Sequence, residues 1–329
     1  MAQGTPPEIV EALEAQARIQ EAEESWADLL STLSKLAALL GELSDEGGAR
    51  AALDRAYQVA QTHGDRQGMA PTLCQVAAGY RQQGGWNRAL ELYHRALALQ
   101  QEAADRAGIA ATLGSIAEVL HGMGDLRRAL ETYRASLALK GNLQDEGGVA
   151  LTWNNIGTVM TRMGDLPGAM AAFQTSLQIQ ERLGDSAARA VTLANIGGIH
   201  QRRENWGEAR RALEGSLALY QELGDGMGMA TTLNALGLVL RRSGDAEGAY
   251  QRYARAKELM EREGDLLRVT IPAHNMALIH EERGEYRQAL GLMEEVIALD
   301  KRIGHPDLRS DLETFGRIRA KLDRERDRS

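Results

Sequence analysis

The sequence predicts an all-α protein in which helix-turn-helix repeats stack into a solenoid. The segment from Gln144 to Leu183 resembles the segments forty residues before and after it, so one structural unit is repeated along the chain. Only 4% of the 329 residues are aromatic, and Ala and Leu dominate, which favours helices over strands. Turn signals rich in Gly and Asp separate the helical segments. We therefore predict one elongated domain.

Composition excludes several classes of function. The formal net charge of -8 argues against a general attraction to nucleic acid or anionic lipid. Cys74 is the only cysteine, so no intrachain disulfide can form. No segment approaches the roughly 18–20 uninterrupted apolar residues of a membrane span, and the first residues lack a basic region followed by an apolar run. We expect no nucleic-acid partner, no membrane insertion and a cytoplasmic location.

Residues 1–23 lie outside the repeat and are predicted to form a helix that covers the first copy. Thr5 can cap this helix, and Pro6 and Pro7 suit its first turn. Its apolar residues recur on roughly one helical face: Ile9, Val10, Leu13 and Ile19. The pattern leaves open whether the helix breaks at Ser25 or continues into the first repeat.

Seven copies span residues 24–303, with starts at 24, 64, 104, 144, 184, 224 and 264. Each copy has an internal turn, marked in order by Ser44-Asp45, Gly84-Gly85, Gly124-Asp125, Gly164-Asp165, Glu204-Asn205, Gly244-Asp245 and Gly284-Glu285. Between copies stand Gly64-Asp65, Gly184-Asp185, Gly224-Asp225 and Gly264-Asp265. A Gly suits the left-handed residue that ends one helix, and the Asp can cap the next. Each copy is thus helix A, a turn and helix B, with helices of about 16 residues and about 24 Å.

Two prolines modify this scheme. Pro71 and Pro272 fall early in helix A of the second and seventh copies. Because proline lacks an N–H donor and clashes with the preceding turn, these two helices should start late or bend.

Aligned positions predict the core. One helix B position is Ala in every copy: Ala49, Ala89, Ala129, Ala169, Ala209, Ala249 and Ala289. A helix A position is always small: Ala37, Ala77, Ala117, Gly157, Gly197, Gly237 and Ala277. Large residues flank them, in helix A at Leu36, Val76, Ile116, Ile156, Ile196, Leu236 and Met276, and in helix B at Leu53, Tyr93, Tyr133, Phe173, Leu213, Tyr253 and Met293. A mid-helix Gly costs about 0.5–1 kcal/mol relative to Ala, so we expect close approach of two helices, packed antiparallel, to offset it.

These residues resemble the tetratricopeptide repeat, whose pattern is W-x2-L-G-x2-Y followed by A-x3-F. The matching residues are Trp153, Ile156, Gly157 and Met160, then Ala169 and Phe173. The period is 40 instead of 34, and the proline that usually closes helix B is missing. The longer period resembles the repeats of kinesin light chain, the spindle-orientation adaptors and bacterial peptide-sensing regulators. This resemblance implies a right-handed superhelix, a concave face lined by helices A, and peptide binding there.

After Gly304 the repeat pattern ends. His305-Pro306-Asp307 can start a helix, and one face is predicted to carry Leu308, Leu312, Phe315, Ile318 and Leu322. Gly316 and Arg317 replace the small and apolar residues of the repeat. We predict a closing helix over residues 304–323 with a polar outer side, and a disordered tail over 324–329.

Candidate binding residues lie on helix A and point away from the core. Asn155 and Arg162 are seven residues apart, which places them on one helical face, and Asn195 and Arg202 repeat the pair one copy later. The sixth copy contributes Asn234, Arg241 and Arg242; Arg81 and His121 extend the stripe backward, and Glu281-Glu282 interrupts it. Asn offers a donor and an acceptor to a peptide backbone, and Arg offers a planar fork to carboxylates. The alternative is that these side chains only solvate the helix face.

The remaining residues with a notable pattern are predicted to have structural roles. The Thr column, Thr72, Thr112, Thr152, Thr192 and Thr232, is expected to bond back to its own helix. His200 and His280 occupy an aromatic position and should pack at an interface, and Cys74 should be buried or half-buried. His274 and His280, six residues apart, lie on opposing helix faces, so we expect no metal site. No Walker loop, H-E-x-x-H or G-x-S-x-G is present, and Gly224-Asp225-Gly226-Met227-Gly228 is explained as a joint between copies.

The sequence therefore predicts a non-catalytic adaptor or regulatory protein without a cofactor, which binds a peptide or protein segment of acidic character along helices A. Three alternatives remain. The chain could self-assemble through its end helices, it could sense a peptide or small molecule and act on a separate effector protein, or it could build an enzyme site from residues of separate copies.

Overall fold

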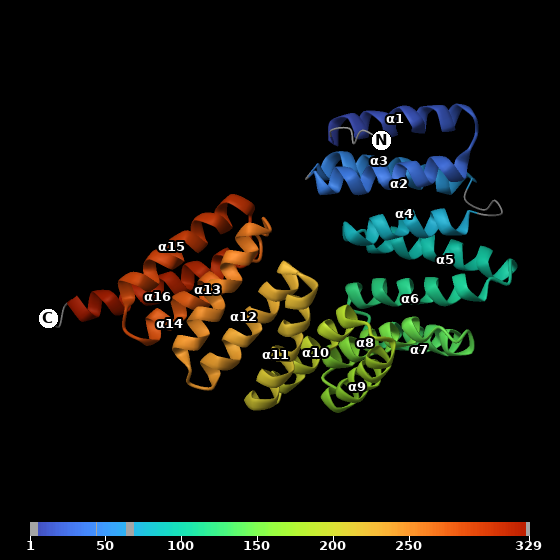
Figure 1. Ribbon diagram of the computed structural model, residues 1–329. Coiled ribbons are helices and arrows are strands. Elements are labelled where there is room, and N and C mark those ends of the chain that lie inside the picture. The colour runs from blue at the N-terminus through green and yellow to red at the C-terminus, as the bar shows by residue number, and fades with distance from the viewer. Residues whose placement is uncertain (1–5, 44, 64–68, 327–329) are drawn as a thin grey trace. The chain divides into compact units, whose positions relative to one another are not determined.

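The computed structural model describes residues 6–43, 45–63 and 69–326, and these residues form helices and turns without a strand (Figure 1). The helices, in chain order, are α1 (Pro6–Ala22), α2 (Trp26–Glu42), α3 (Glu46–His63), α4 (Ala70–Gln82), α5 (Trp86–Glu102), α6 (Arg106–Met123), α7 (Leu126–Asn142), α8 (Glu146–Met163), α9 (Leu166–Leu183), α10 (Ser186–Arg202), α11 (Trp206–Leu223), α12 (Gly226–Arg242), α13 (Ala246–Arg262), α14 (Thr270–Glu282), α15 (Tyr286–Ile303) and α16 (Leu308–Arg326). Even-numbered helices from α2 to α14 are helices A, and odd-numbered helices from α3 to α15 are helices B. No helix in these ranges is both long and apolar enough to cross a membrane.

A left-handed residue separates neighbouring helices at intervals of twenty residues. These residues are Glu24, Gly84, Ala104, Gly124, Gln144, Gly164, Gly184, Glu204, Gly224, Gly244, Gly264, Gly284 and Gly304. Where Asp follows, its carboxylate caps the next helix, except at Asp265; Asp125, for example, accepts a hydrogen bond from the backbone N–H of Arg128. The predicted Asp cap is therefore confirmed at the other described Gly-Asp turns, whereas α14 begins at Thr270 without a side-chain cap. Thr5, Ser44 and Gly64-Asp65 lie outside the described residues.

The two prolines shorten their helices as predicted. Helices α4 and α14 each contain 13 residues, whereas the other helices A contain 17 or 18. Pro71 stands in the first turn of α4. Backbone N–H groups in the first turn have no acceptor within the helix, so proline removes no helical hydrogen bond there. Proline therefore sets where these two helices begin without kinking them.

The alanine column of helix B lies fully inside the core, because all seven of its members are 0% exposed. The large residues predicted to flank the small columns are also buried. In helix A the glycines allow close approach: a Cβ at Gly197 would lie 2.7 Å from Leu213 Cγ, and one at Gly237 would lie 2.5 Å from Tyr253 Cε1. Contacts with these large side chains offset the conformational cost of the two glycines. The predicted knob-and-hole packing is confirmed at these positions.

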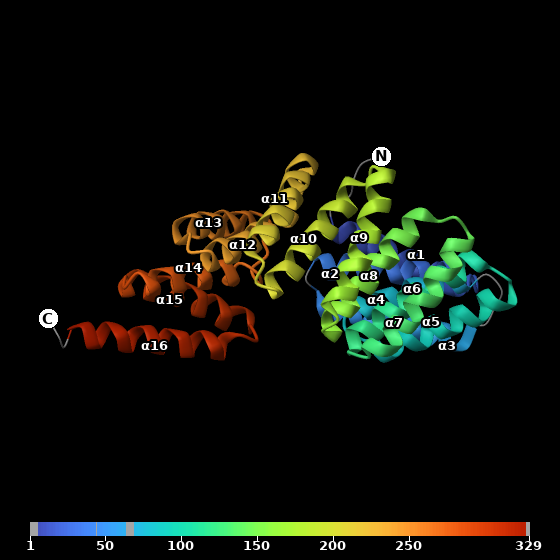
Figure 2. The same cartoon turned by 90° about the horizontal axis from the view of Figure 1, so that it is seen from below.

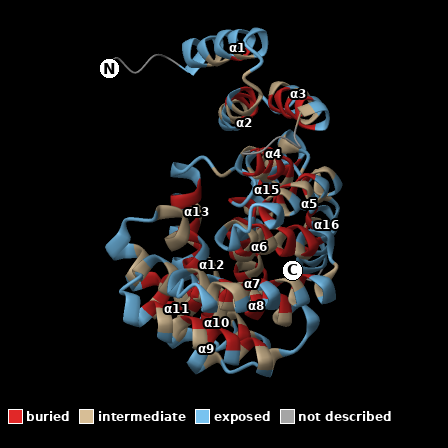
Figure 3. Ribbon diagram, turned by 90° about the vertical axis from the view of Figure 1, so that its right-hand side faces the viewer, coloured by how far each residue is buried: buried red, intermediate tan, exposed pale blue. Residues whose placement is uncertain are grey.

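The chain divides into two compact units, Met1–Ala172 and Phe173–Ser329. In the first unit, consecutive helices pack side by side and helices A also touch, α2 with α4 and α4 with α6. In the second unit, the same arrangement recurs from α10 onward, and α10 touches α12. Buried and exposed residues alternate along the helices of both units (Figure 3). Each unit therefore has a layer of helices A whose outward faces are open to solvent.

The N-terminal helix differs in part from its prediction. It ends at Ala22, and the left-handed Glu24 separates it from α2, so it does not continue into the first repeat. Val10 and Leu13 pack against the core of the first unit, but Ile9 and Ile19 are 41% and 58% exposed. The prediction that all four lie on roughly one helical face is wrong, because Ile19 lies about 80° from Ile9 at 100° per residue, on the side away from Val10.

The closing helix α16 lies along α15 (Figure 2). Ile318 is fully buried, and Glu313 and Asp323 on the opposite side of the helix are exposed, which confirms a polar outer side. Leu312 is 44% exposed and does not belong to the buried face. The helix continues to Arg326, so residues 324–326 are helical instead of disordered, because Arg and Glu favour helix and basic residues stabilise a helix C-terminus. Residues 327–329 lie outside the described residues.

Candidate functional site

Helices A share a solvent-exposed stripe with a common chemistry. In α8 the stripe begins with Leu151, continues four residues later with Asn155 and ends seven residues further at Arg162. These intervals place the three side chains on one face of the helix. We call this face of each helix A the A stripe.

The A stripe repeats in the second unit. In α10 it consists of Val191, Asn195 and Arg202, and in α14 of Ile271, Asn275 and Glu282. In α12 the same positions are Thr231, Ala235 and Arg242, and the candidates Asn234 and Arg241 each stand one position earlier. The apolar members are open to solvent: Leu151 is 56% exposed, Val191 45% and Ile271 43%. An exposed apolar residue beside amide and basic groups is suited to contact a partner side chain while the polar groups fix its backbone.

In the first unit, the basic groups of the A stripe already have partners. Arg162 donates from Nη1 to the backbone carbonyl of His121 at 2.8 Å. Burial and the neighbouring Arg162 lower the pKa of His121, so this imidazole is neutral at neutral pH. Arg81 lies 2.6 Å from Glu118 of the next copy. In the predicted extension of the stripe, the Arg81 side chain is therefore paired with Glu118, and His121 contributes its backbone carbonyl to Arg162.

In the second unit, contacts run along the stripe between α12 and α14. Arg241 donates from Nε and Nη2 to Glu282 Oε1 at 3.1 and 2.5 Å, and this hydrogen bond raises the pKa of the guanidinium. Asn275 donates from Nδ2 to Asn234 Oδ1 at 3.3 Å. Arg242 is exposed and has no hydrogen bond or ion pair within the part of the chain that the structure describes. The predicted interruption by Glu282 is thus a specific neutralisation of Arg241 that leaves Arg242 accessible.

The seven candidate residues therefore differ in how accessible their side chains are to a binding partner. Asn155, Asn195, Asn234 and Arg241 are half-buried, whereas Arg162, Arg202 and Arg242 are exposed. Sequence reasoning missed the apolar members Leu151, Val191 and Ile271. Their signal was present, since each stands four positions before an amide on a face otherwise polar.

The predicted bond of the threonine column to its own helix is confirmed at Thr72 and Thr152. Thr152 donates to the carbonyl of Gly148 at 2.7 Å, and Thr72 donates to that of Met69 at 2.8 Å. A serine column in helix B was missed: Ser136 and Ser216 are fully buried and donate to the carbonyls of Ala110 and Ala190 at 2.7 and 2.8 Å. Each of these serines ties a helix B to the helix A of its own copy.

The histidines and the cysteine occupy interfaces between helices. His280 is half-buried, packs edge-on against Tyr250 of α13 and bonds to Glu285, which confirms its packing role. His200 is also half-buried. Cys74 is half-buried with its Sγ 3.4 Å from Thr112 Oγ1, and burial raises the pKa of its thiol. No group of three or more His, Cys, Asp or Glu side chains within residues 6–43, 45–63 and 69–326 is arranged to hold a metal ion.

The repeat register agrees with comparisons to known proteins. The profile of the tetratricopeptide repeat family matches residues 68–141, 148–222 and 228–302, which is more than half of the chain. The chain belongs to the tetratricopeptide repeat family. Comparison with curated protein sequences gave no significant match.

Several solved structures share the tetratricopeptide repeat fold with this chain. BtubC (BKLC) from P. vanneervenii is 22% identical, with 64% of this chain and 88% of that chain covered and a TM-score of 0.55. The apo form of RapI is 17% identical, with 84% and 98% covered and a TM-score of 0.63. Aspartyl phosphate phosphatase F from Bacillus subtilis is 14% identical, with 86% and 73% covered and a TM-score of 0.65. At these identities the similarity establishes the fold.

Proposed function

We propose that this tetratricopeptide repeat protein is a non-catalytic adaptor that binds a segment of a partner protein on its A stripes. The observation that carries the proposal is the repetition, in α10 and α12 of the second unit, of an exposed arginine, Arg202 or Arg242, preceded on the same helix by a half-buried amide. A repeated stripe can hold an extended segment that presents the same groups at successive positions. A cytoplasmic location is part of this proposal, since the single cysteine excludes an intrachain disulfide.

The charges of the stripe favour a partner with acidic side chains. Arg202 and Arg242 are exposed at the same end of α10 and α12. Two or three charge-assisted hydrogen bonds contribute about 1.5–3 kcal/mol each, whereas micromolar affinity requires about -8 kcal/mol after ordering costs. Burial of Val191 by an apolar partner side chain supplies part of the difference, so we expect a segment that combines acidic and apolar residues.

The test is a charge reversal. Arg162, Arg202 and Arg242 changed together to Glu should abolish pull-down of the native partner, because each change replaces a donor by a repelling carboxylate. Helical content, measured by circular dichroism, should not change. The matched control reverses Arg134, Arg252 and Arg287, which are exposed arginines on helices B, so it has the same net charge. Undiminished binding by the first variant, or equal loss in both, would reject the A stripe as the site.

A second candidate function is self-assembly through the end helices. Its specific support is the apolar surface that these helices leave open, Ile9 and Ile19 in α1 and Leu312 in α16. Light scattering over a concentration series distinguishes it, because a strictly monomeric protein would leave this second candidate without support.

A further inference from the structure

Lys140 is one of only five lysines in the chain, and its amino group lies between three helices of the first unit. The side chain extends from the last turn of α7 and is half-buried. Its Nζ donates to Thr152 Oγ1 at 3.0 Å and lies 3.5 Å from the backbone carbonyl oxygen of Gly148, both in α8. A Cβ at Gly114 of α6 would lie 3.9 Å from the same Nζ. The amino group is therefore held where the third and fourth copies meet.

The surroundings of this amino group disfavour its positive charge. Burial lowers the pKa of Lys140, against the attraction of the Asp145 and Glu118 carboxylates. Asp145 caps α8 through the backbone N–H of Gly148, and Glu118 is paired with Arg81. Gly148 also lies in the first turn of α8, at the positive end of the helix dipole. A larger share of this amine is therefore neutral and nucleophilic at neutral pH than in an ordinary lysine.

The copies on either side carry a neutral amide at the position of Lys140. Gln100 in the second copy and Gln180 in the fourth occupy this position, and their residues are only 6% and 2% exposed. None of the other six copies has a basic residue there. The fold therefore accommodates a neutral amide at this position, and a neutral amide is the group that acylation of a lysine produces.

Gly114 leaves the α6 side of the amino group without a covering side chain. At the equivalent position, α8 and α12 carry Asn154 and Asn234. In α6 even a Cβ would already be in contact with Nζ, so an asparagine at Gly114 would cover the amine. Because Lys140 is half-buried and not fully enclosed, a small reagent can approach its amine from this side.

We propose that Lys140 is a site of N-acylation by a small acyl phosphate. The neutral Nζ attacks the carbonyl carbon of the acyl group, so that a C–N bond forms and the bond from this carbon to the phosphate oxygen breaks. Inorganic phosphate leaves with the bonding electron pair, and the amine releases one proton to it or to solvent. The product is an amide without charge. The reaction needs no partner protein, so this proposal does not depend on the proposed function.

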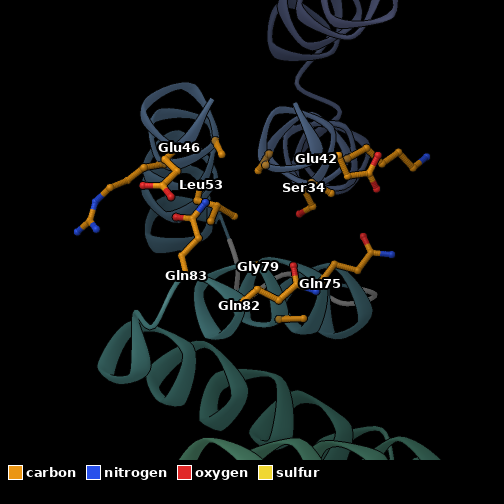
Figure 4. A pocket seen from close by; sticks show the side chains of 15 residues that line it. Ser34, Glu42, Glu46, Leu53, Gln75, Gly79, Gln82 and Gln83 are labelled. Atoms are coloured by element: carbon orange, nitrogen blue, oxygen red, sulfur yellow. The ribbon is translucent and has the colours of Figure 1, made fainter. Parts of the chain in front are cut away.

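Lys35 is a reference lysine with open access to solvent. It lines a pocket of about 990 Å³ between α2, α3 and α4, and Figure 4 shows Glu42 and Glu46 among the other lining residues. Lys35 is exposed, whereas Lys140 is half-buried. If access alone controlled acylation, Lys35 would therefore react faster. Faster reaction of Lys140 can arise only from the surroundings of its amine.

The experiment treats the full-length protein with acetyl phosphate at pH 7.5 and at pH 10.5. Mass spectrometry of the resulting peptides gives the initial rate of acetylation of each lysine. At pH 7.5 we expect Lys140 to be acetylated about fivefold faster than the exposed Lys35 and Lys301. This preference should disappear at pH 10.5, because an ordinary lysine amine is then about half neutral.

A variant of Gly114 tests the contribution of the surroundings. Gly114→Asn places beside Nζ the residue that α8 and α12 carry, which covers the amine and accepts a hydrogen bond from its charged form, so it should abolish the preference. The matched control, Gly198→Asn, makes the same substitution in α10, where a Cβ would meet no atom within 4 Å, and it should leave the acetylation of Lys140 unchanged.

The wild-type pH series decides the proposal by itself if circular dichroism shows that Gly114→Asn affects folding. Three results would overturn the proposal. These are acetylation of Lys140 no faster than that of Lys35 at pH 7.5, a preference that persists at pH 10.5, and a preference that a folded Gly114→Asn variant retains.

Discussion

At the residue scale, the ion pair between Arg241 and Glu282 controls how much positive charge the A stripe offers. The pair joins α12 to α14, and the Arg241 side chain is only 20% exposed. Such partly exposed pairs contribute about 0–1 kcal/mol to stability, so the fold tolerates their loss. A partner carboxylate must compete with Glu282 for this guanidinium.

Glu282→Gln should therefore strengthen the binding of an acidic peptide selected on the wild-type protein. The neutral amide competes less well for Arg241, and we expect a gain of about two- to fivefold, equivalent to about 0.5–1 kcal/mol. Fluorescence anisotropy measures it. The control, Glu295→Gln, removes the same charge from a pair with Lys257 between helices B and should leave affinity unchanged. Equal affinity of the Glu282→Gln variant and the wild type would show that Arg241 does not contact the ligand.

A buried carboxyl pair makes the closing helix sensitive to pH. Asp300 of α15 is fully buried, and Asp311 of α16 is 5% exposed. Burial and the neighbouring Asp311 carboxyl raise the pKa of Asp300 to about 6. His274 of α14 bonds to Asp311, and His305 and Asp307 of the connecting turn also face the pair. The protonated form of Asp300 is therefore the one that the folded protein favours.

A raised pKa means that the stabilising contribution of Asp300 is present at low pH and is lost as pH rises through about 6. The side chain of the Asp300→Asn variant is neutral at every pH. At pH 7.5 we therefore expect the free energy of unfolding of this variant to be about 1–2 kcal/mol higher than that of the wild type, so the variant is more stable. At pH 4 the two proteins should be similar. Chemical denaturation followed by circular dichroism at both values measures this. A difference that does not depend on pH would contradict the assignment.

At the scale of the element, some turns between helices lack the glycine that the other turns have at the left-handed position. Nine of the thirteen left-handed positions in the described ranges are Gly, and the others are Glu24, Ala104, Gln144 and Glu204. A residue with a Cβ costs about 1–2 kcal/mol in this conformation. The hydrogen bonds of the turn are retained; the backbone N–H of Asn205, for example, bonds to the carbonyl of His200 at 2.9 Å. The non-glycine turns are thus formed at an energetic cost.

Glu204→Gly should stabilise the protein by about 0.5–1 kcal/mol, since the relief of the left-handed conformation exceeds the added entropy of the unfolded chain. Thermal and chemical denaturation measure the change. The reverse substitution at the equivalent turn of the sixth copy, Gly244→Glu, should destabilise by a similar amount, because Gly244 has a φ of 90°. No stabilisation by Glu204→Gly, or no loss at Gly244, would show that the turn conformation carries no strain.

At the scale of the whole molecule, a repeat array must cover the last face of its stack. In the second unit this cover is α16, which docks through Ile318 and through Glu281 of α14. Arg317 donates two hydrogen bonds to Glu281, at 3.0 and 2.9 Å, and Lys321 lies 2.9 Å from the same carboxylate. Glu281 is only 8% exposed, so its charge depends on these partners.

Removal of residues 305–329 should therefore expose apolar surface and a buried carboxylate, which lowers the melting temperature and promotes association. Light scattering over a concentration series and thermal denaturation measure both effects. The control removes only residues 324–329 and keeps Arg317 and Lys321, so it should behave as the intact chain does. A shortened protein that is monomeric and equally stable would show that α16 is not a structural cover.

The forty-residue period was sufficient to predict the repeats, the turns and the core, because each depends on residues close in sequence or on the same position in successive copies. The candidate site was only partly predictable. Which residues share a face of helix A follows from their spacing, but the pairing of Arg241 with Glu282 depends on the distance between two neighbouring helices.

The central claim is that a partner lies on the outward faces of helices A. Photo-crosslinking tests it most directly, with p-benzoylphenylalanine placed at Val191 on the A stripe of α10 or at the exposed Gln251 on helix B α13. We predict that the Val191 probe captures a discrete partner, that the Gln251 probe does not, and that Arg202→Glu with Arg242→Glu abolishes the capture. Capture of the same partner from Gln251, or capture from Val191 that survives the arginine reversal, would contradict the claim.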